Sequence, residues 1–135
     1  MRQRSRGERG SMAVEVVILV PVLIVLMMLV VAFGRYVDMR GDIQAVARDA
    51  VRAATLERDR PAAEAAAQAI ADQTMPASAT CEPVALRGDF LPGQTVTVRV
   101  RCHVSYAGLG FIGLPGTVPI NGDSSAPIDT LRRTG

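Results

Sequence analysis

The stretch VVILVPVLIVLMMLVVAF, residues 16–33, decides the fold of this 135-residue chain. It holds eighteen consecutive residues without a charge, and only Pro21 and Phe33 are neither aliphatic nor methionine. At a rise of about 1.5 Å per residue, a helix of this length spans roughly 27 Å, which is close to the hydrocarbon thickness of a bilayer. We therefore expect a membrane-anchored chain with one transmembrane helix over residues 11–34.

Charge is distributed unequally on the two sides of this span, although the net charge of the whole chain is only +2. Residues 1–10 form a basic leader, in which four arginines accompany a single acid: Arg2, Arg4, Arg6, Arg9 and Glu8. The charges just beyond the span cancel: Arg35, Asp38, Arg40 and Asp42. Because positive charge resists translocation, we expect a cytoplasmic N-terminus and an extracytoplasmic C-terminal domain.

Helical periodicity continues beyond the span and predicts an extracytoplasmic helical region over residues 35–76. Apolar residues recur there at spacings of three and four, on one helical stripe: Tyr36, Met39, Ile43, Val46, Ala50 and Ala53. The pattern favours one long helix from about Met12 to Leu56, transmembrane first and amphipathic afterwards. Pro61 suits the first turn of a second, shorter helix over the Ala-rich stretch Ala62–Gln73, which Met75-Pro76 ends.

Residues 77–135 change to the periodicity of strands and predict a small β-rich domain. The stretch Thr95–Tyr106 alternates strictly and is the strongest strand in the chain. Pro83–Leu86 is expected to be its shorter partner, joined through a turn-rich loop. Two more short strands, Thr117–Ile120 and Ile128–Leu131, are expected around the tight-turn pair Asn121-Gly122. The predicted class is α+β, with the long helix and the short helix packed on a small antiparallel sheet.

The two cysteines, Cys81 and Cys102, both lie on the expected extracytoplasmic side. An even number of cysteines in an oxidising compartment favours one disulfide, although two small buried thiols are the alternative. Such a bond would stabilise the domain by about 3 kcal/mol in the chain-entropy model. We expect no metal site, because the single histidine, His103, adjoins Cys102 without further ligands nearby.

Glu15 stands at the start of the transmembrane helix, where a carboxylate is costly to bury and usually has a partner. A position in the headgroup region, favoured by the helix N-terminus, would account for it equally well. Its setting favours a specific role, because Gly10 lies five positions before it, arginines precede Gly10 and the apolar run follows.

This arrangement resembles the class III-type signal of type IV prepilins, in which a prepilin peptidase cuts after glycine and glutamate is the fifth residue of the mature chain. More narrowly, Arg9-Gly10-Ser11-Met12-Ala13-Val14-Glu15, followed by Pro21 and by Phe33-Gly34-Arg35-Tyr36, is similar to the TadE-like family. The resemblance covers roughly Arg9 to Ala53. It implies cleavage between Gly10 and Ser11.

The family consists of pseudopilins, or minor pilins, of tight-adherence (Flp-type) secretion systems. The resemblance therefore implies a structural component of a pilus assembly in the bacterial cell membrane, with other pilins, the assembly machinery and prepilin peptidase as partners. It also implies that Glu15 pairs with the α-amino group of Ser11 on an adjacent copy. Pro21, which removes the backbone hydrogen bond to Val17, would then bend the helix for packing in the assembly.

Three other classes of protein are alternatives to a pseudopilin. An uncleaved, single-pass membrane-anchored exported binding module would keep its leader and would not need Glu15. A secreted protein with a cleaved signal peptide is disfavoured, because the apolar run is too long and no Ala-x-Ala site follows. An enzyme is not expected, because no nucleophile stands with a base and no pair of acids forms a plausible site.

Two features of the sequence suggest a binding or catalytic function but are not assigned one. Gly108–Gly113 matches GxGxxG after a strand, but Leu114-Pro115-Gly116 follows where a dinucleotide site needs a helix, so a flexible glycine loop is expected. His103 lies on the polar face of its strand and is expected to be a surface residue. We therefore expect no cofactor, no small-molecule substrate and no nucleic acid as partner.

Overall fold

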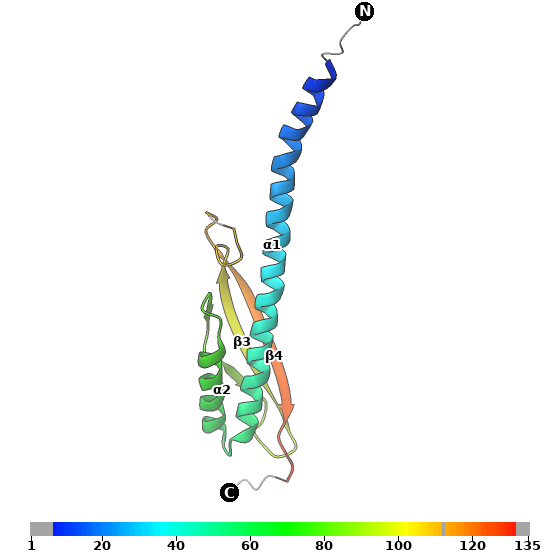
Figure 1. Ribbon diagram of the computed structural model, residues 1–135. Coiled ribbons are helices and arrows are strands. Elements are labelled where there is room, and N and C mark those ends of the chain that lie inside the picture. The colour runs from blue at the N-terminus through cyan, green and yellow to red at the C-terminus, as the bar shows by residue number, and fades with distance from the viewer. Residues whose placement is uncertain (1–6, 112, 132–135) are drawn as a thin grey trace, which may run out of the picture.

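The computed structural model describes residues 7–111 and 113–131 and contains two helices and one four-stranded sheet. The helices are α1 (Gly7–Leu56) and α2 (Arg60–Thr74). The strands are β1 (Ala79–Cys81), β2 (Ala85–Arg87), β3 (Thr95–Ser105) and β4 (Thr117–Pro127). Figure 1 shows the lower half of α1, together with α2, lying against the sheet, while the upper half of α1 projects beyond it. The predicted α+β class is confirmed.

Helix α1 is a single helix of 50 residues that runs through Pro21 without a break. It begins at Gly7 rather than near the expected Met12, and it ends at Leu56 as the sequence predicts. Its two halves differ in surroundings, because the side chains from Met12 to Val31 are exposed, whereas the predicted stripe of the lower half is packed. Ile43, Val46 and Ala50 are buried, and Tyr36 and Met39 pack partly buried against the same core.

Helix α2 covers the other part of the sheet and begins and ends where its sequence signals predict. Asp59 is the N-cap, and its Oδ1 accepts a hydrogen bond of 2.9 Å from the backbone N–H of Ala62. Such a cap satisfies one of the free N–H groups of the first turn. Every fourth residue of the helix packs into the core as a small side chain: Ala63, Ala67 and Ala71. These alanines let α2 lie close against α1.

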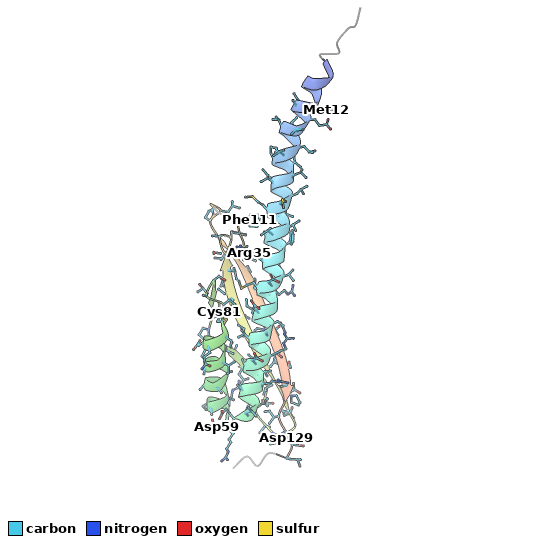
Figure 2. All side chains as sticks on the ribbon, viewed as in Figure 1. Met12, Arg35, Asp59, Cys81, Phe111 and Asp129 are labelled. Atoms are coloured by element: carbon cyan, nitrogen blue, oxygen red, sulfur yellow. A yellow bond between two sulfur atoms is a disulfide. The ribbon has the colours of Figure 1, made fainter. Side chains whose placement is uncertain are left out.

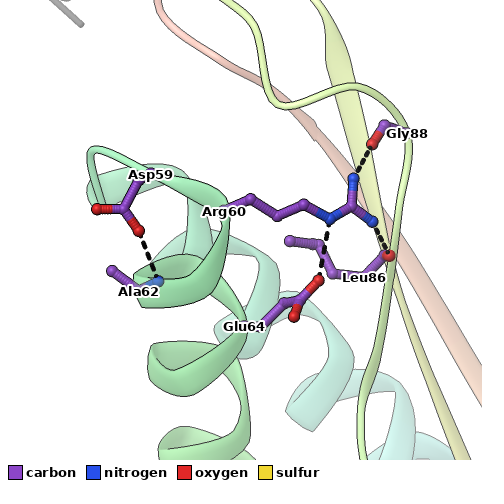
Figure 3. A network of polar contacts seen from close by, with 6 residues as sticks. All are labelled: Asp59, Arg60, Ala62, Glu64, Leu86 and Gly88. Carbon is purple, nitrogen blue, oxygen red and sulfur yellow. Dashed lines mark hydrogen bonds and ion pairs between the residues drawn. The ribbon is translucent and has the colours of Figure 1, made fainter. Parts of the chain in front are cut away.

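Arg60 ties the start of α2 to the sheet (Figure 3). Its guanidinium donates hydrogen bonds of 2.8 Å to the backbone carbonyls of Leu86 and Gly88, while its Nε lies 3.0 Å from Glu64 Oε1. Gly88 itself needs to be glycine, because its φ is +98° and a Cβ there would lie 2.6 Å from the carbonyl oxygen of Thr95. The turn after β2 is therefore held in place both by the backbone conformation of Gly88 and by the hydrogen bonds that Arg60 of α2 donates to it.

Strand β3 is the centre of the sheet. Strand β4 pairs with it antiparallel along its whole length, and β1 and β2 pair antiparallel with its two ends. Cys81 is opposite Cys102 and Ala85 is opposite Arg99, so four steps along the chain from β1 to β2 match three steps along β3. The extra residue is a bulge that divides one edge strand into two. The expected partner strand Pro83–Leu86 is thus β2, shifted to Ala85–Arg87.

Strand β4 corrects the prediction for the last part of the chain. Two short strands around an Asn121-Gly122 turn were expected, but residues 117–127 form one continuous strand and residues 128–131 are not a strand. Gly122 is opposite Val100 and lies directly against α1, where a Cβ would be 2.7 Å from the carbonyl oxygen of Ile43. The glycine therefore serves a close approach of strand and helix, and the local turn signal of Asn-Gly is overridden.

The face of the sheet that meets the helices forms the core, and its other face is polar. The predicted alternation of β3 is confirmed by the buried side chains of that strand: Val96, Val98, Val100, Cys102 and Val104. On the polar face Arg99 Nε lies 2.8 Å from Asp123 Oδ1, and the hydroxyls of Thr97 and Ser125 are hydrogen-bonded. His103 is exposed there, as expected.

Candidate functional site

The upper half of α1 has the properties that a membrane span requires. The helix from Met12 to Leu56 contains an 18-residue window with a mean hydropathy of 3.4, of which only 6% is buried inside the protein. A core helix of a soluble protein with such a composition would be covered by its own chain. The apolar side chains here face outward instead, so α1 is long and apolar enough to cross a membrane and leaves its surface available to lipid or to other helices.

Gly10 and Ser11, the residues of the predicted cleavage site, lie inside α1, four residues or fewer after its start at Gly7. Residues 1–6 of the predicted leader lie outside the described residues. A peptidase cuts an extended backbone, so access to the Gly10–Ser11 bond needs the first turns of α1 to open. Helix ends open most easily, because their first N–H groups have no partner within the helix. The position near the helix end is compatible with processing.

Glu15 lies on the exposed surface of α1, one turn beyond Ser11. Among the residues that the structure describes, the ion pairs are Arg60–Glu64 and Arg99–Asp123, so Glu15 belongs to none of them. Both of those pairs lie far along the chain, one within α2 and one between β3 and β4. A carboxylate at the edge of an apolar span is stabilised by a cation.

Pro21 lies six residues beyond Glu15, in the interior of the helix. Its ring removes the hydrogen bond that a backbone N–H would donate to the carbonyl of Val17. Figure 1 shows α1 as a continuous and gently curved helix through this region. The carbonyl of Val17 is thus left without its usual helical partner on a part of the helix that the domain does not cover.

The two cysteines form the predicted disulfide. Cys81 of β1 and Cys102 of β3 are directly opposite each other, with their Cα atoms 4.0 Å apart. Cys102 faces the core, as the alternation predicts, and its sulfur lies 3.6 Å from the sulfur of Met75 at the end of α2. The disulfide therefore links the short strand β1 to the central strand β3, and it lies next to the end of α2, the helix that precedes β1 in the chain. Its role is structural.

The glycine-rich loop between β3 and β4 was expected to be flexible and without a function, yet it packs on α1. A strand follows it, so it belongs to a hairpin and not to a dinucleotide-binding unit. Leu109 is buried and Phe111 partly buried against α1, and both line an apolar groove of about 280 Å³ that Leu29, Ala32 and Phe33 close from the helix side. In Figure 2, Phe111 lies farther toward Met12 than Arg35 does, so the loop reaches past the end of the sheet.

Comparison with known proteins places part of this chain near a known family. The model of the family described as TadE-like protein matches residues 10–52, which begin at the predicted cleavage site and end inside the lower half of α1. Neither the curated proteins nor the solved structures gave a match. The sheet domain lies outside the matched segment. The resemblance to the TadE-like family is thus confirmed for residues 10–52, the part of the chain that forms most of α1.

Proposed function

We propose that this chain is a TadE-like pseudopilin, a membrane-anchored structural component of a tight-adherence pilus assembly and secretion system. It is cut after Gly10 by a prepilin peptidase and assembles with other pilins through the upper half of α1. The basic leader stays in the cytoplasm and the sheet domain lies on the extracytoplasmic side, in accordance with the charge distribution. The role is structural and not enzymatic.

The observation that carries this proposal is Glu15, an exposed carboxylate at the start of an apolar helix and outside every described ion pair. Cleavage after Gly10 would create a new α-amino group at Ser11. In an assembly the carboxylate of one copy and the amine of its neighbour would offset two charges that are each expensive in lipid. The match to the TadE-like family begins at Gly10, which supports this use of the glycine–glutamate spacing.

Cleavage is tested by the intact mass of the protein purified from membranes of a host that has its own prepilin peptidase. A chain that starts at Ser11 is expected. Gly10→Val should block processing and leave the full-length chain, whereas Gly7→Val, a matched change within the leader, should leave processing intact. A wild-type chain that starts at Met1 would contradict the proposal and favour an uncleaved anchored module. A start beyond Gly34 would indicate a released domain.

Assembly is tested separately with Glu15→Gln, which keeps the shape of the side chain and removes its charge. We expect at least a tenfold loss of crosslinked or co-purified pilin partners, which corresponds to about 1.4 kcal/mol or more. The amount of protein in the membrane fraction should stay unchanged. Asp38→Asn is the control, because this carboxylate is also exposed on α1 but lies beyond the apolar run. Assembly at the wild-type level in Glu15→Gln would remove Glu15 from the mechanism.

A further inference from the structure

The β3–β4 loop, defined here as residues 106–111 and 113–116, lies beside the part of α1 that is apolar enough to span a membrane. Leu109 is only 4% exposed, because it packs against the helix. Gly110 lines a second apolar hollow, of about 230 Å³, whose other walls are residues of the span, including Met27 and Val31. Figure 1 likewise shows this loop above the end of the sheet, alongside α1. The loop therefore extends the domain to the level of the span.

The depth of the loop follows from the helix itself. The helix residues of this hollow, from Ile24 to Val31, lie nine to two residues before Phe33, where the apolar run ends. At about 1.5 Å per residue, the hollow lies roughly 3–13 Å inside the apolar run. The guanidinium of Arg35 extends to the same loop and lies 3.9 Å from where a Cβ of Gly110 would be. Tyr36 of α1 and Tyr106 of the loop both line the apolar groove of about 280 Å³ described above. Tyrosines at that level are typical of the boundary between headgroups and acyl chains.

The composition of the loop suits a membrane interface. From Val104 to Gly122 the chain contains no charged residue, although the strands on both sides carry Arg101 and Asp123. In the same loop, Leu114 leaves 58% of its surface exposed. An exposed leucine next to uncharged backbone is unremarkable in water, but this loop packs on an exposed apolar helix through Leu109 and Phe111. Both surfaces would be covered by one lipid leaflet.

The backbone of residues 108–111 also meets the requirement of a medium poor in water, in which unpaired N–H groups are costly. The N–H of Gly108 donates to Ser105 Oγ at 3.1 Å, and that of Gly110 donates to the carbonyl of Ala107 at 3.1 Å. The N–H groups of Leu109 and Phe111 donate to the carbonyl of Tyr106, at 3.1 and 2.9 Å. Four consecutive donors, the N–H groups of residues 108–111, are thus satisfied within the loop.

We propose that the β3–β4 loop inserts into the lipid leaflet next to the sheet domain and makes a second membrane contact beside the span. The inference rests on the proposal that residues 16–33 cross the membrane. Lipid is the occupant that the structure favours, because the loop is continuous with the span, lies at its depth and carries no charge. The two contacts together hold the sheet domain upright against the membrane surface.

Tryptophan fluorescence tests this proposal, because the chain contains no tryptophan. Three single variants of the full-length chain use exposed leucines: Leu114→Trp in the loop, Leu26→Trp in the span and Leu91→Trp in the loop before β3. Leu91 is matched to Leu114, since both are 58% exposed, but it lies at the other end of the domain. The proteins are reconstituted into vesicles of phosphatidylethanolamine and phosphatidylglycerol, with and without brominated acyl chains, which quench tryptophan on contact.

We expect the emission of Leu114→Trp to shift to the blue and to be quenched by brominated lipid at least about half as strongly as that of Leu26→Trp, the benchmark for burial in hydrocarbon. Leu91→Trp should emit as in water and remain unquenched. If Leu114→Trp behaves like Leu91→Trp while Leu26→Trp is quenched, the loop proposal is wrong and the anchor stands. Blue-shifted but unquenched emission would mean that protein covers the loop, which also overturns the proposal. If Leu26→Trp is unquenched too, the anchor and the loop insertion both fail.

Discussion

The two halves of α1 are one continuous helix in two different surroundings. In the upper half, large aliphatic side chains are exposed all around the helix, as at Ile24, which is 52% exposed. In the lower half, the buried positions form a single stripe that includes Ile43, which is fully buried, and then become alanines where α2 packs closely. Polar side chains occupy the rest of that surface. The comparison shows that one continuous helix leaves its apolar side chains exposed in the upper half and packs them on the domain in the lower half.

Because of this difference in burial, substitutions in the two halves of α1 should affect different properties of the protein. The lower half shares a hydrophobic core with the sheet and α2, so substitutions there should change the free energy of unfolding of the domain. The upper half makes few contacts with the rest of the chain apart from those with the β3–β4 loop. Substitutions in the upper half should affect insertion and assembly and should leave the stability of the domain nearly unchanged.

The strongest test of this comparison uses the same residue type in both halves. Ile43→Ala removes a fully buried side chain and should destabilise the domain by about 2–5 kcal/mol. Ile18→Ala, on the exposed upper half and outside the groove and the hollow at the loop, should change the domain's free energy of unfolding by less than about 0.5 kcal/mol. Urea unfolding of the full-length chain in detergent micelles, followed by circular dichroism, measures both. Equal effects of the two substitutions would disprove the separation of the two halves.

Removal of the disulfide should have the next largest effect, and only on the sheet domain. The bond links residues 21 positions apart, so its loss in the double variant Cys81→Ala/Cys102→Ala should cost about 3 kcal/mol in the chain-entropy model. Wild-type protein treated with a reductant is the control and should match the variant in urea. A stability within about 1 kcal/mol of the oxidised protein would show that β1 is held by other contacts.

Gly122 tests the contact between α1 and β4. Gly122→Ala places a Cβ 2.7 Å from the carbonyl oxygen of Ile43, so helix and strand must separate, at a cost of about 1–3 kcal/mol. Gly41→Ala is the matched change, since no atom lies within 4 Å of its added Cβ and alanine favours a helix. It should stabilise the domain by about 0.5–1 kcal/mol. Opposite signs in thermal unfolding are expected; a neutral Gly122→Ala would refute the close approach.

The smallest effect is expected on the polar face of the sheet. Arg99 and Asp123 form an ion pair of 2.8 Å, but their side chains are 33% and 51% exposed, so solvent weakens the attraction. A double-mutant cycle with Arg99→Gln and Asp123→Asn should give a coupling of about 0.2–1 kcal/mol that falls as salt is added. The hydroxyl pair Thr97–Ser125 is an uncharged comparison with little dependence on salt. A coupling that is insensitive to salt would argue against an ionic interaction.

The sequence was sufficient for the elements whose signals are local and long. The apolar run and the stripe after it predicted α1, Pro61 and the alanines predicted α2, and the alternation from Val96 to Val104 predicted the central strand. The disulfide was predicted from the even count of cysteines and the expected oxidising compartment, and the structure confirms it. The helices and the central strand depend on periodicity, which can be read from a single sequence.

The features that the sequence could not supply depend on contacts between distant segments. Asn121-Gly122 has the local signal of a turn, but Gly122 is required by the helix surface at Ile43, about eighty residues earlier in the chain. The division of one edge strand into β1 and β2 depends on a register offset opposite β3, which no local pattern reports. The packing of Leu109 on α1 was missed for the same reason. The absence of charge from Val104 to Gly122 was a signal that could have suggested it.

Strands β3 and β4 run along α1 rather than across it, as Figure 1 shows. Each has 11 residues and is about 37 Å long, beside a helix of 50 residues that is about 75 Å long. The sheet therefore adds thickness to one side of the lower half of α1. In the proposed membrane-anchored arrangement, one copy would occupy the area of two helices and a narrow sheet, so the spacing of neighbouring copies would be limited by the width of these two layers and not by the length of the domain.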